Sequence, residues 1–384
     1  MSHRIAVVID AWDHPFNGTV VSTRRFVREL QALGMDVRLL TLDDGSGDVG
    51  RGFSKLSIPG LNHIIDRMHA PLAVPDRKRV RAALEGCTLL HVQWPFFLGH
   101  TAIGIARELN IPVVCSFHVQ PENILQNLGL DSTLLSKALY KLFIARLYGR
   151  ADHVIAPSNL AARMLKHHDL TRPISVLSNG VPERFFGIQR STERHSDLVV
   201  LSVGRLAREK HQDLILEAAA RSRHRDRLTV HLVGVGPCAP ELQALAARLN
   251  VRAHIGRADD DELNQLYARA DLFVHASGVE LEGMSVLEAM ASGNTVVVSD
   301  SEDSEASQFV DYEHGRFTAG DVTSLVDNMD FWLDDAEARS ERGCSNRRAA
   351  RAHHLDRSTG LLIGIYESLL GDLGLQQPAS GVGR

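Results

Sequence analysis

The feature that most constrains the fold is a regular alternation of short apolar segments with longer amphipathic segments. Apolar runs such as RIAVVID (4–10) and DVRLLTL (36–42) have the length of buried parallel strands. Between them, the segment from about Val20 to Leu33 places its apolar residues at helical spacing. Strands that alternate with helices in this way form a doubly wound parallel sheet, so the sequence predicts an α/β fold.

The alternation stops once and then starts again. It runs to ISVLSNG (174–180), and the polar, charged segment 182–197 that follows is typical of a linker. It resumes with DLVVLSVG (197–204) and continues to TVVVSD (295–300). We therefore expect two Rossmann-like domains, residues 1–184 and 185–360, that face a central cleft, because parallel sheets bind ligands at the carboxyl ends of their strands. Residues 361–384 are expected to form a helix that packs back towards the first domain, followed by a flexible tail.

Length and composition are consistent with this division. A chain of 384 residues is too long for one ordinary core, and 44% hydrophobic with 23% charged residues is typical of a globular protein. A net charge of −5 gives no reason to expect a nucleic-acid partner. The sequence contains no apolar run of membrane-spanning length, no secretory signal and no zinc-binding cysteine spacing, which together favour a reduced cytoplasmic protein.

Two segments depart from the alternation. Residues 43–80 form a long irregular stretch rich in glycine, of a kind that is usually functional or disordered. Residues 132–150 mix leucines with the cations Lys137, Lys141 and Arg146. A basic amphipathic helix can lie on an anionic membrane surface, on the acceptor side of an enzyme, whereas composition alone favours a domain helix with a solvated basic face.

An acidic stretch late in the chain indicates a ligand site. In VELEGMSVLEAMASG (279–293), Glu280 lies in the loop after a strand, Gly283 opens a helix and Glu288 lies one turn inside it. The first N–H groups of a helix have no internal partner and suit a phosphate, while flanking carboxylates suit sugar and ribose hydroxyls. The alternative is an ordinary helix N-terminus with acidic residues favoured by the helix dipole, and spacing alone does not separate the two.

A pair of cations supports the ligand interpretation. Arg205 and Lys210 follow the strand 197–204 and suit a diphosphate at the carboxyl end of the sheet. They could neutralise a leaving nucleoside diphosphate without a metal. The alternative is surface charge, which is the interpretation favoured for the neighbouring Arg208 and Glu209.

These motifs resemble a known family. GRLAREK (204–210) and the E-x7-E pattern from Glu280 to Glu288, followed by AMASG (289–293), are similar to the retaining nucleotide-sugar glycosyltransferases of family 4, which have the GT-B fold. The resemblance covers nearly the whole chain, because further motifs fall in the family's order: NGT (17–19), SFHVQ (116–120), APSNLAARML (156–165), VLSNGVP (176–182), VGVGP (233–237) and DLFVHAS (271–277). The acidic stretch and FHVQPEN (117–123) look more like lipid or envelope-polysaccharide members than sucrose or starch members.

The resemblance implies a role for each matching residue. Arg205 and Lys210 match the pair that holds the donor diphosphate, Glu280 the glutamate that contacts the transferred sugar, and Glu288 the glutamate that binds the ribose. His118 matches the histidine near the reacting carbon. The remaining implied donor-binding positions are backbone positions: Gly18, Gly234, Gly236, Gly283, Met284, Ser285 and Val286.

Three departures from the family pattern concern its motif positions. The first loop has one glycine where the family often has two, which affects the acceptor side. Leu281 replaces the usual glycine after the first glutamate, and Glu282 follows it. We expect Glu282 to be solvated, and the alternative is that its carboxylate contacts a sugar hydroxyl. Pro182 stands where an acidic residue is often found.

One run of acidic residues is similar to a metal-binding motif. Asp259, Asp260 and Asp261 resemble the metal-binding acids of the other glycosyltransferase fold, but they precede a helical pattern and fit the first turn of a helix better. We therefore expect neither a metal nor another cofactor.

The resulting hypothesis is a retaining, metal-independent hexosyltransferase, cytoplasmic and bound peripherally to the inner face of a membrane. It would use a UDP- or GDP-sugar and a lipid, lipid-linked or envelope-glycan acceptor. The resemblance implies front-face attack, with closure of the domains excluding water. Alternatives are transfer to a soluble small molecule or glycan, a phosphorylase or epimerase on the same fold, and a non-catalytic nucleotide-sugar-binding protein.

Overall fold

The structure is a computed structural model of the whole chain that describes residues 3–13, 17–42, 45, 48, 50–57, 71–127, 130, 132–191 and 196–371. It divides into two compact units. Unit 1 contains residues 1–178 together with 356–384, and unit 2 contains residues 179–355. The predicted C-terminal tail and much of the irregular stretch 43–80 lie outside the described residues.

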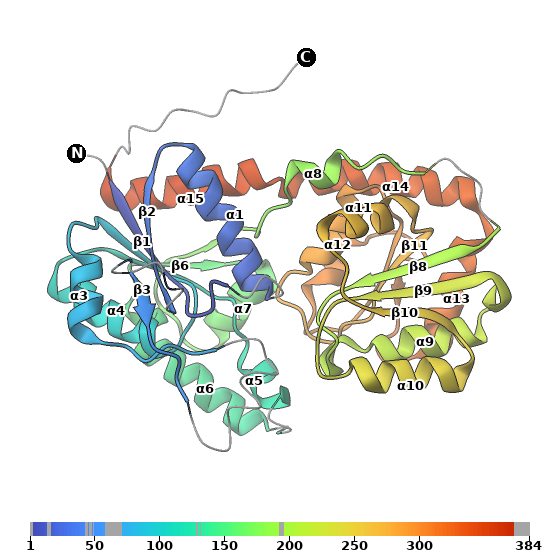
Figure 1. Cartoon of the computed structure of the whole chain (residues 1–384), viewed down its shortest axis with the longest axis horizontal. Coiled ribbons are helices and arrows are strands. Elements are labelled where there is room, and N and C mark those ends of the chain that lie inside the picture. The colour runs from blue at the N-terminus through green and yellow to red at the C-terminus, as the bar shows by residue number, and fades with distance from the viewer. Residues whose placement is uncertain are drawn as a thin grey trace, which may run out of the picture. The chain divides into compact units, whose positions relative to one another are not determined.

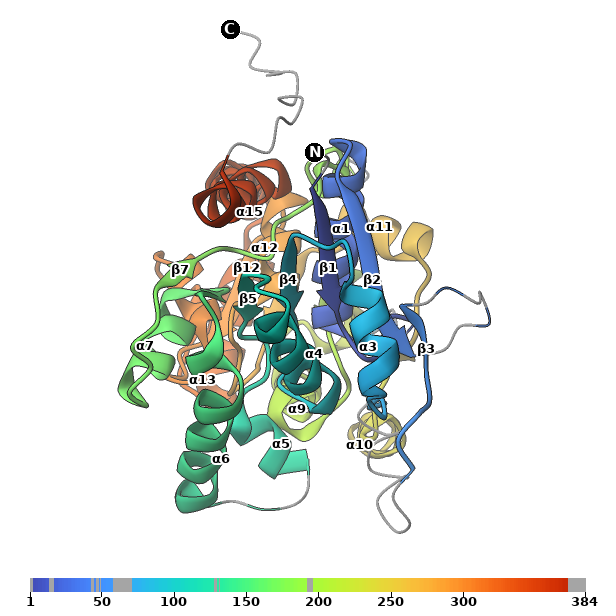
Figure 2. The same cartoon turned by 90° about the vertical axis from the view of Figure 1, so that its left-hand side faces the viewer.

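Unit 1 is built on a parallel sheet of seven strands, in the order β3-β2-β1-β4-β5-β6-β7 (Figure 1). The strands are β1 (Arg4–Val8), β2 (Asp36–Leu42), β3 (Arg51–Phe53), β4 (Leu89–Val92), β5 (Val113–Ser116), β6 (His153–Ala156) and β7 (Ile174–Val176). The helices are α1 (Gly18–Ala32), α3 (Arg77–Leu84), α4 (Phe97–Glu108), α5 (Pro121–Asn127), α6 (Thr133–Arg146), the 3₁₀ turn η1 (Tyr148–Arg150), α7 (Asn159–His167) and α15 (Leu355–Leu370). In Figure 2, α3 and α4 lie side by side, and they pack against each other.

Unit 2 is built on a second parallel sheet, of six strands in the order β10-β9-β8-β11-β12-β13. The strands are β8 (Leu198–Val203), β9 (Leu228–Val233), β10 (Arg252–Gly256), β11 (Leu272–His275), β12 (Val296–Ser299) and β13 (Arg316–Phe317). The α-helices are α8 (Glu183–Phe186), α9 (Gln212–Arg221), α10 (Ala239–Leu249), α11 (Asp260–Arg269), α12 (Met284–Ala291), α13 (Val322–Asp334) and α14 (Ala336–Ala350). The 3₁₀ turns are η2 (Arg208–Lys210), η3 (Arg225–Arg227), η4 (Glu305–Phe309) and η5 (Arg351–His353). The two Rossmann-like sheets confirm the predicted α/β fold class.

Each sheet is buried on both faces, which explains the continuous apolar runs of its strands. In unit 2, one core cluster joins the sheet to α9, α10 and α13, and a second joins its other face to α12 and to Tyr267 of α11. In unit 1, strand residues pack with α1 and α15 in one cluster.

The C-terminal helix α15 belongs to the core of unit 1. Leu362, Ile365 and Tyr366 pack with strand residues of β1, β4, β5 and β6. The Tyr366 hydroxyl lies 2.7 Å from Nδ1 of His91, whose Nε2 lies 2.8 Å from the Ser116 hydroxyl. Burial and the nearby His118 lower the pKa of His91 to about 3, so this imidazole is neutral and acts as a link between two hydroxyls.

The structure corrects two sequence-based assignments. The segment 182–197 is not simply a polar linker, because it contains α8, whose Phe185 and Phe186 are buried in a core cluster of unit 2. The stretch 43–80 contains the strand β3 and the start of α3, both of which the sequence analysis missed. The short helix α8 and the three-residue strand β3 contain too few residues to show a hydrophobic periodicity in the sequence.

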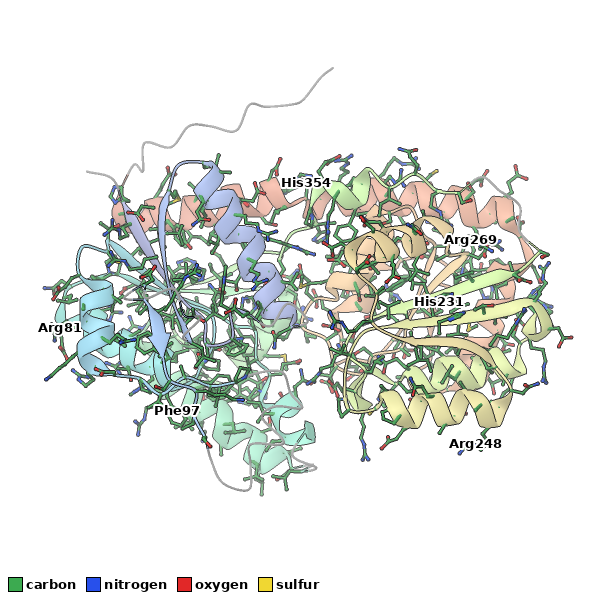
Figure 3. The ribbon with its side chains drawn as sticks, in the orientation of Figure 1. Arg81, Phe97, His231, Arg248, Arg269 and His354 are labelled. Carbon is green, nitrogen blue, oxygen red and sulfur yellow. The ribbon has the colours of Figure 1, made fainter. Side chains whose placement is uncertain are left out.

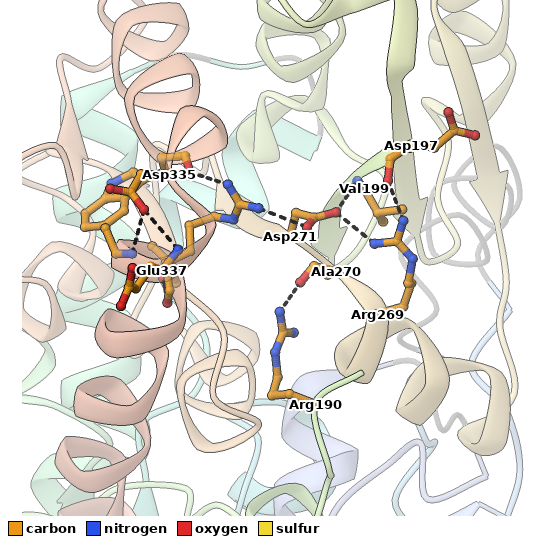
Figure 4. Close-up of polar contacts among 12 residues, drawn as sticks. Arg190, Asp197, Val199, Arg269, Ala270, Asp271, Asp335 and Glu337 are labelled. Carbon is orange, nitrogen blue, oxygen red and sulfur yellow. Dashed lines mark hydrogen bonds and ion pairs between the residues drawn. The ribbon is translucent and has the colours of Figure 1, made fainter. Parts of the chain in front are cut away.

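The amino edge of the unit 2 sheet is tied together by a charged network (Figure 4). The Asp271 carboxylate accepts from the Val199 backbone N–H at 2.8 Å and from Arg269 at 2.8 Å. Arg339 of α14 approaches its other oxygen to 3.2 Å. Arg190 donates to the carbonyl of Ala270 beside it, and burial lowers the pKa of this guanidinium to about 10. These contacts fix the ends of β8 and β11 against the surrounding helices.

Candidate functional site

A charged cluster lies at the carboxyl edge of the unit 2 sheet. Lys210 ends η2, which follows β8, and its ammonium donates to the carboxylate of Glu280, in the loop after β11. His275, the last residue of β11, has its Nε2 3.4 Å from the same carboxylate. Burial opposes ionisation of Glu280, but Lys210 and His275 outweigh it, so the pKa of Glu280 lies well below its usual range. The carboxylate is therefore an anion at neutral pH.

Backbone contacts explain why Lys210 and Glu280 meet although they are far apart in sequence. The carbonyl of Glu209 accepts from the Gly278 N–H at 3.0 Å, which joins the loops after β8 and β11. The Glu280 N–H donates to the Asp303 carbonyl at 3.1 Å, and its carbonyl accepts from the Glu305 N–H at 2.9 Å. Glu280 is therefore held on both sides by backbone, and its side chain is positioned without depending on its own flexibility.

Arg205 has a partner that the sequence analysis misjudged. The Arg205 guanidinium pairs with the carboxylate of Glu209, one helical turn along the chain. The expectation that Glu209 is surface charge is wrong, because its side chain is only 4% exposed, whereas Arg208 is exposed as expected. Gln212 also donates to the Arg205 carbonyl at 2.8 Å. Glu209 therefore positions Arg205 at the same sheet edge as Lys210.

The N-terminus of α12 lies beside these charges. Gly283 is the N-cap residue and has φ +93°, a left-handed conformation that favours glycine. The Val286 N–H donates to the Gly283 carbonyl at 3.0 Å, as the first bond of the helix turn. No partner for the N–H groups of Met284 and Ser285 is found among the described residues. These two groups are the unsatisfied donors expected at a helix start.

Glu288 lies one turn further into α12 and is buried. The Tyr267 hydroxyl lies 3.5 Å from its Oε2. The side chain projects from the same helix as the unsatisfied N–H groups, but it is 8% exposed in this structure.

Glu282 is buried and not solvated as expected. Its carboxylate accepts from the Asn179 backbone N–H at 3.1 Å and from the Asn179 side-chain amide at 2.6 Å. Asn179 is the first residue of unit 2. A carboxylate that accepts several N–H groups can remain buried at little cost, which explains how this departure from the family pattern is tolerated.

Gly234 and Gly236 follow β9 in the neighbouring loop. A side chain on Gly234 would meet the Gly204 carbonyl oxygen at 1.9 Å, and one on Gly236 would meet that of Leu206 at 2.2 Å. These glycines therefore allow two loops of unit 2 to pack backbone against backbone. Close packing accounts for both residues whether or not a ligand also approaches them.

Gly18 and His118 belong to unit 1. Gly18 is exposed and is the first residue of α1, where the Asn17 side chain caps the helix by accepting from the Thr19 N–H at 3.0 Å. His118 follows β5, and its Nε2 lies 3.1 Å from the side-chain oxygen of Gln93, which follows β4. Burial lowers the pKa of His118 to about 4. His118 is therefore neutral, and donation to Gln93 leaves its Nδ1 as an acceptor.

Asp10 is a further buried acid of unit 1, directly beyond β1. One carboxylate oxygen accepts from the Ala73 N–H at 2.8 Å. Burial raises the pKa of Asp10 to about 7, although the Ala73 N–H opposes this shift. Asp10 thus ties the end of the irregular stretch to the carboxyl edge of the sheet.

The cations predicted on the acceptor side lie on α6 of unit 1. Lys137, Lys141 and Arg146 are exposed, while Tyr140 and Phe143 face the core. Leucines share the exposed face: Leu134 is 79% exposed, and Leu135 and Leu142 are about half exposed at 45% and 48%. No described helix combines the length and the apolar character that crossing a membrane would require.

The acidic run 259–261 is a helix start, as preferred in the sequence analysis. Asp259 is the N-cap of α11 and forms a capping box with Glu262. Its side chain accepts from the Glu262 N–H at 2.8 Å. These acids thus have a structural function, and within the described ranges no group of three or more metal-ligating side chains occurs.

Four contact residues of these sites were missed or misjudged from the sequence. His275 and Gln93 carried a usable signal, because each is a polar residue at the end of an otherwise apolar strand segment. Glu209 and Glu282 carried none, because no local sequence pattern distinguishes a buried carboxylate from an exposed one.

Two family models match consecutive parts of the chain. "Glycosyltransferase Family 4" matches residues 16–185, and "Glycosyl transferases group 1" matches residues 184–348. Together they cover the sheet of unit 2, every strand of the unit 1 sheet except β1, and every family motif described above.

Several known proteins are similar to this chain in sequence. It is 25% identical over 312 residues to the alpha-monoglucosyldiacylglycerol synthase of Streptococcus pneumoniae, covering 77% of this chain and 70% of that protein. It is 29% identical over 311 residues to a GDP-mannose-dependent alpha-mannosyltransferase of Mycolicibacterium smegmatis, covering 77% and 80%. A sulfoquinovosyl transferase of Arabidopsis thaliana is 26% identical over 346 residues, which cover 84% of this chain and 65% of that protein.

Solved structures show the same fold. The sucrose-phosphate synthase of Thermosynechococcus elongatus superimposes with a TM-score of 0.72 at 17% identity, covering 96% of this chain and 99% of that one. HepE of Anabaena, in complex with UDP-glucose, also gives 0.72, at 16% identity and with 95% and 99% coverage. With both family models matched in order over two sheets of this kind, the chain belongs to the family 4 glycosyltransferases of the GT-B fold.

Proposed function

We propose that the chain is a retaining, metal-independent hexosyltransferase that moves a sugar from a UDP- or GDP-linked donor to a lipid, or to a lipid-linked or envelope glycan, at an anionic membrane surface. The observation that carries this proposal is the group at one sheet edge of unit 2: Arg205, Lys210, Glu280 and the unsatisfied N–H groups of α12. Cations and N–H groups suit a diphosphate, and an ionised carboxylate suits sugar hydroxyls.

Donor binding uses both the paired side chains of this sheet edge and the unsatisfied N–H groups of α12. The diphosphate accepts from Arg205, from Lys210 and from the N–H groups of Met284 and Ser285. Lys210 then exchanges part of its bond to Glu280 for the phosphate, which frees the Glu280 carboxylate for the hydroxyls of the transferred sugar. Glu288 accepts from the ribose hydroxyls. The two cations supply the charge stabilisation that a metal ion provides in other enzymes.

The transfer step breaks the bond between the anomeric carbon and the phosphate oxygen, and the electron pair leaves with the phosphate. The acceptor hydroxyl oxygen bonds to the anomeric carbon on the same face, which gives retention. Its proton goes to the departing phosphate oxygen, so no protein base is required. Arg205 and Lys210 stabilise the charge that develops on the phosphate, and neutral His118 accepts a hydrogen bond from the sugar.

A lipid acceptor is supported by α6. Its leucines Leu134, Leu135 and Leu142 are exposed among three cations, and such a surface suits insertion into an anionic headgroup layer. Two relatives have names that specify diacylglycerol or sulfoquinovosyl products, which fits a glycolipid. The four cysteines are free thiols, as in a reducing compartment, so we place the reaction at the inner face of the membrane.

The deciding experiment measures nucleotide release from UDP-, GDP- and ADP-sugars, with and without an extracted membrane lipid fraction. Release from one donor that depends on lipid, with an α-linked glycolipid as the product of an α-linked donor, is the expected result, and excess EDTA should leave the rate unchanged. Slow hydrolysis of one donor at the same rate with and without lipid would instead indicate that the acceptor is a soluble molecule. Binding of a donor without any turnover would instead indicate a nucleotide-sugar-binding protein.

A second experiment tests the membrane surface alone. Replacing Lys137, Lys141 and Arg146 by Glu should release the protein from anionic vesicles in a sedimentation assay, because each cation near such a surface contributes about 1 kcal/mol. Arg248→Glu on the exposed part of α10 in unit 2 is the matched control (Figure 3). Equal sedimentation of the triple variant and this control would remove the membrane contact from the proposal.

A further inference from the structure

A pocket of about 600 Å³ lies on the outer side of α4 in unit 1, and the proposed reaction does not use it. We call it the α4 basic pocket. Its walls are formed by a few charged and polar residues: Arg77, His100, Thr101, Gly104, Arg107, Glu108 and Arg150. Most of them share one face of α4, because they recur at helical spacing from His100 to Glu108.

The fold builds the other walls from two more elements. Arg77 is the first residue of α3, which packs against α4. Arg150 ends η1, and its carbonyl accepts from Arg107 of α4 at 2.5 Å. Arg107 also pairs with Asp152 at 2.9 Å, which fixes η1 against α4. The pocket walls are therefore held in place by secondary structure and by backbone bonds.

The charges of the pocket are unequally matched. Glu108 is shared by Arg77, at 2.7 Å, and Arg81. Arg107 is paired with Asp152, whereas the guanidinium of Arg150 is half-buried and has no carboxylate partner within the described part of the chain. The lining itself contains three guanidinium groups and one carboxylate, and each guanidinium carries five donors. The pocket has spare donors and an excess of positive charge.

His100 reflects that excess. Burial, together with the charges of Arg150 and then Arg146, lowers the pKa of His100. The imidazole is therefore a neutral hydrogen-bonding group in an electropositive surrounding. The hydroxyl of Thr101, the next residue, supplies a further donor at the same wall.

Gly104 keeps the floor of the pocket open. It lies in the middle of α4 with no side chain, and a Cβ placed there would come 4.0 Å from Nη1 of Arg77. An alanine would fit at that distance, whereas a longer side chain would fill the space between α4 and Arg77. The pocket can therefore be closed without removing any charge.

We propose that the α4 basic pocket binds a phosphate group, carried by the headgroup of an anionic membrane lipid or by a soluble phosphate ester. A tetrahedral anion matches the forked donors of Arg150 and Arg77, with His100 and Thr101 completing its hydrogen bonds. The lipid source rests on the proposed membrane function, whereas phosphate binding itself does not.

The surroundings of the pocket favour the lipid source. Phe97, on the same face of α4, is 57% exposed (Figure 3). The first turn of α4 packs close to the end of α6, because a Cβ on Gly99 would lie 3.7 Å from Leu147. The pocket therefore adjoins an exposed aromatic ring and the helix that carries the exposed leucines. An apolar border beside an anion site suits a lipid whose headgroup phosphate lies at the membrane surface.

The test uses the full chain and vesicles of a neutral galactolipid. Equal negative surface charge is supplied either by phosphatidylglycerol or by oleate, so that only the first carries a phosphate. The wild-type protein should bind the phosphatidylglycerol vesicles about tenfold more tightly, as a charge-assisted bidentate contact would give. Arg150→Ala and Gly104→Leu should each abolish that preference. Gly104→Ala and Arg248→Ala should keep it.

A titration with glycerol phosphate followed by calorimetry distinguishes the sources. Saturable binding that Arg150→Ala removes, without any vesicle preference, would assign the pocket to a soluble phosphate ester. Absence of both the vesicle preference and the soluble binding overturns the proposal. Donor-sugar hydrolysis in solution should be the same for wild type and Arg150→Ala. If no donor is hydrolysed but the Arg150-dependent preference for phosphatidylglycerol vesicles persists, the proposed function is wrong whereas phosphate binding by the pocket is supported.

Discussion

The two edges of the unit 2 sheet use the same side-chain chemistry for different purposes. At the amino edge, Asp271 is shared by a backbone N–H and by Arg269 and Arg339 (Figure 4). At the carboxyl edge, Lys210 and Glu280 pair with each other, beside a helix start with unsatisfied N–H groups. Both edges contain carboxylates held by cations within the same domain.

The two edges differ in what holds their carboxylates in place. The carboxylate oxygens of Asp271 accept hydrogen bonds from the protein itself, because the donors belong to β8, α11 and α14. Glu280 is held by its own backbone, so its side chain does not have to hold the loop together. A charged group whose neighbours are already fixed by backbone is available to a ligand, and this distinction predicts which substitutions affect activity and which affect stability.

The largest expected effect is on catalysis at the carboxyl edge. Glu280→Ala should lower turnover by about 10²–10³-fold, as removal of a preorganised polar group at a reacting centre does, with far less change in nucleotide affinity. Turnover and the nucleotide dissociation constant are measured separately. Glu241→Ala, an exposed glutamate of α10, is the control. Activity equal to wild type would remove Glu280 from the sugar site.

The next effect is on stability at the amino edge. Asp271→Ala should lower the free energy of unfolding by about 3 kcal/mol, because it leaves two guanidinium groups and a backbone N–H without their shared acceptor. Turnover per folded molecule should not change. Urea unfolding of this variant and of Asp226→Ala, whose side chain is 99% exposed, provides the measurement. If Asp271→Ala instead lowers turnover of the folded protein, the two edges do not differ as described.

Glu282 sharpens the comparison, because it lies in the ligand loop yet resembles Asp271. Glu282→Gln should lower the free energy of unfolding by about 1–2 kcal/mol, since the new amide faces the Asn179 donors. A double-mutant cycle with Asn179→Ala, followed by urea unfolding, measures the coupling directly. Because Asn179→Ala keeps the backbone N–H that also donates to Glu282, additive effects of the two substitutions would show that the bond from the Asn179 side-chain amide contributes nothing.

The smallest effect is a pH dependence at the carboxyl edge. The pKa of Glu280 is lowered in the folded protein from its ordinary value of 4.5, so the stability it contributes is present above that value and is lost as pH falls through the folded pKa. Between about pH 5 and pH 3, wild type should therefore lose stability more steeply than Glu280→Gln. Buried neutral histidines such as His118 also destabilise the folded protein at low pH, below their unfolded pKa. This contribution is the same in wild type and in Glu280→Gln, so it cancels in the comparison. Parallel curves would mean that the Lys210 contact does not shift Glu280.

Local patterns in the amino-acid sequence were enough to predict the fold class and the positions of the motif residues along the fold. Apolar runs and period-3.6 patterns are local, so runs such as 4–10 and 295–300, which alternate with helical segments, were enough to predict the strands and their parallel arrangement. The same logic placed Glu280 and Gly283 where a strand gives way to a helix. It could also assign Asp259 to a helix cap, because capping is a matter of neighbouring residues.

Tertiary packing, in contrast, determines which charged groups are buried and which residues they contact. Glu209 and Glu282 were expected to be solvated, yet both are buried. Glu209 pairs with Arg205 four residues earlier, whereas Glu282 accepts from Asn179, which is 103 residues away in the sequence. In α6, Leu134 and Leu142 face outwards although an apolar residue is normally assigned to the core. Burial depends on which elements pack together across long sequence separations, and no local pattern contains that information.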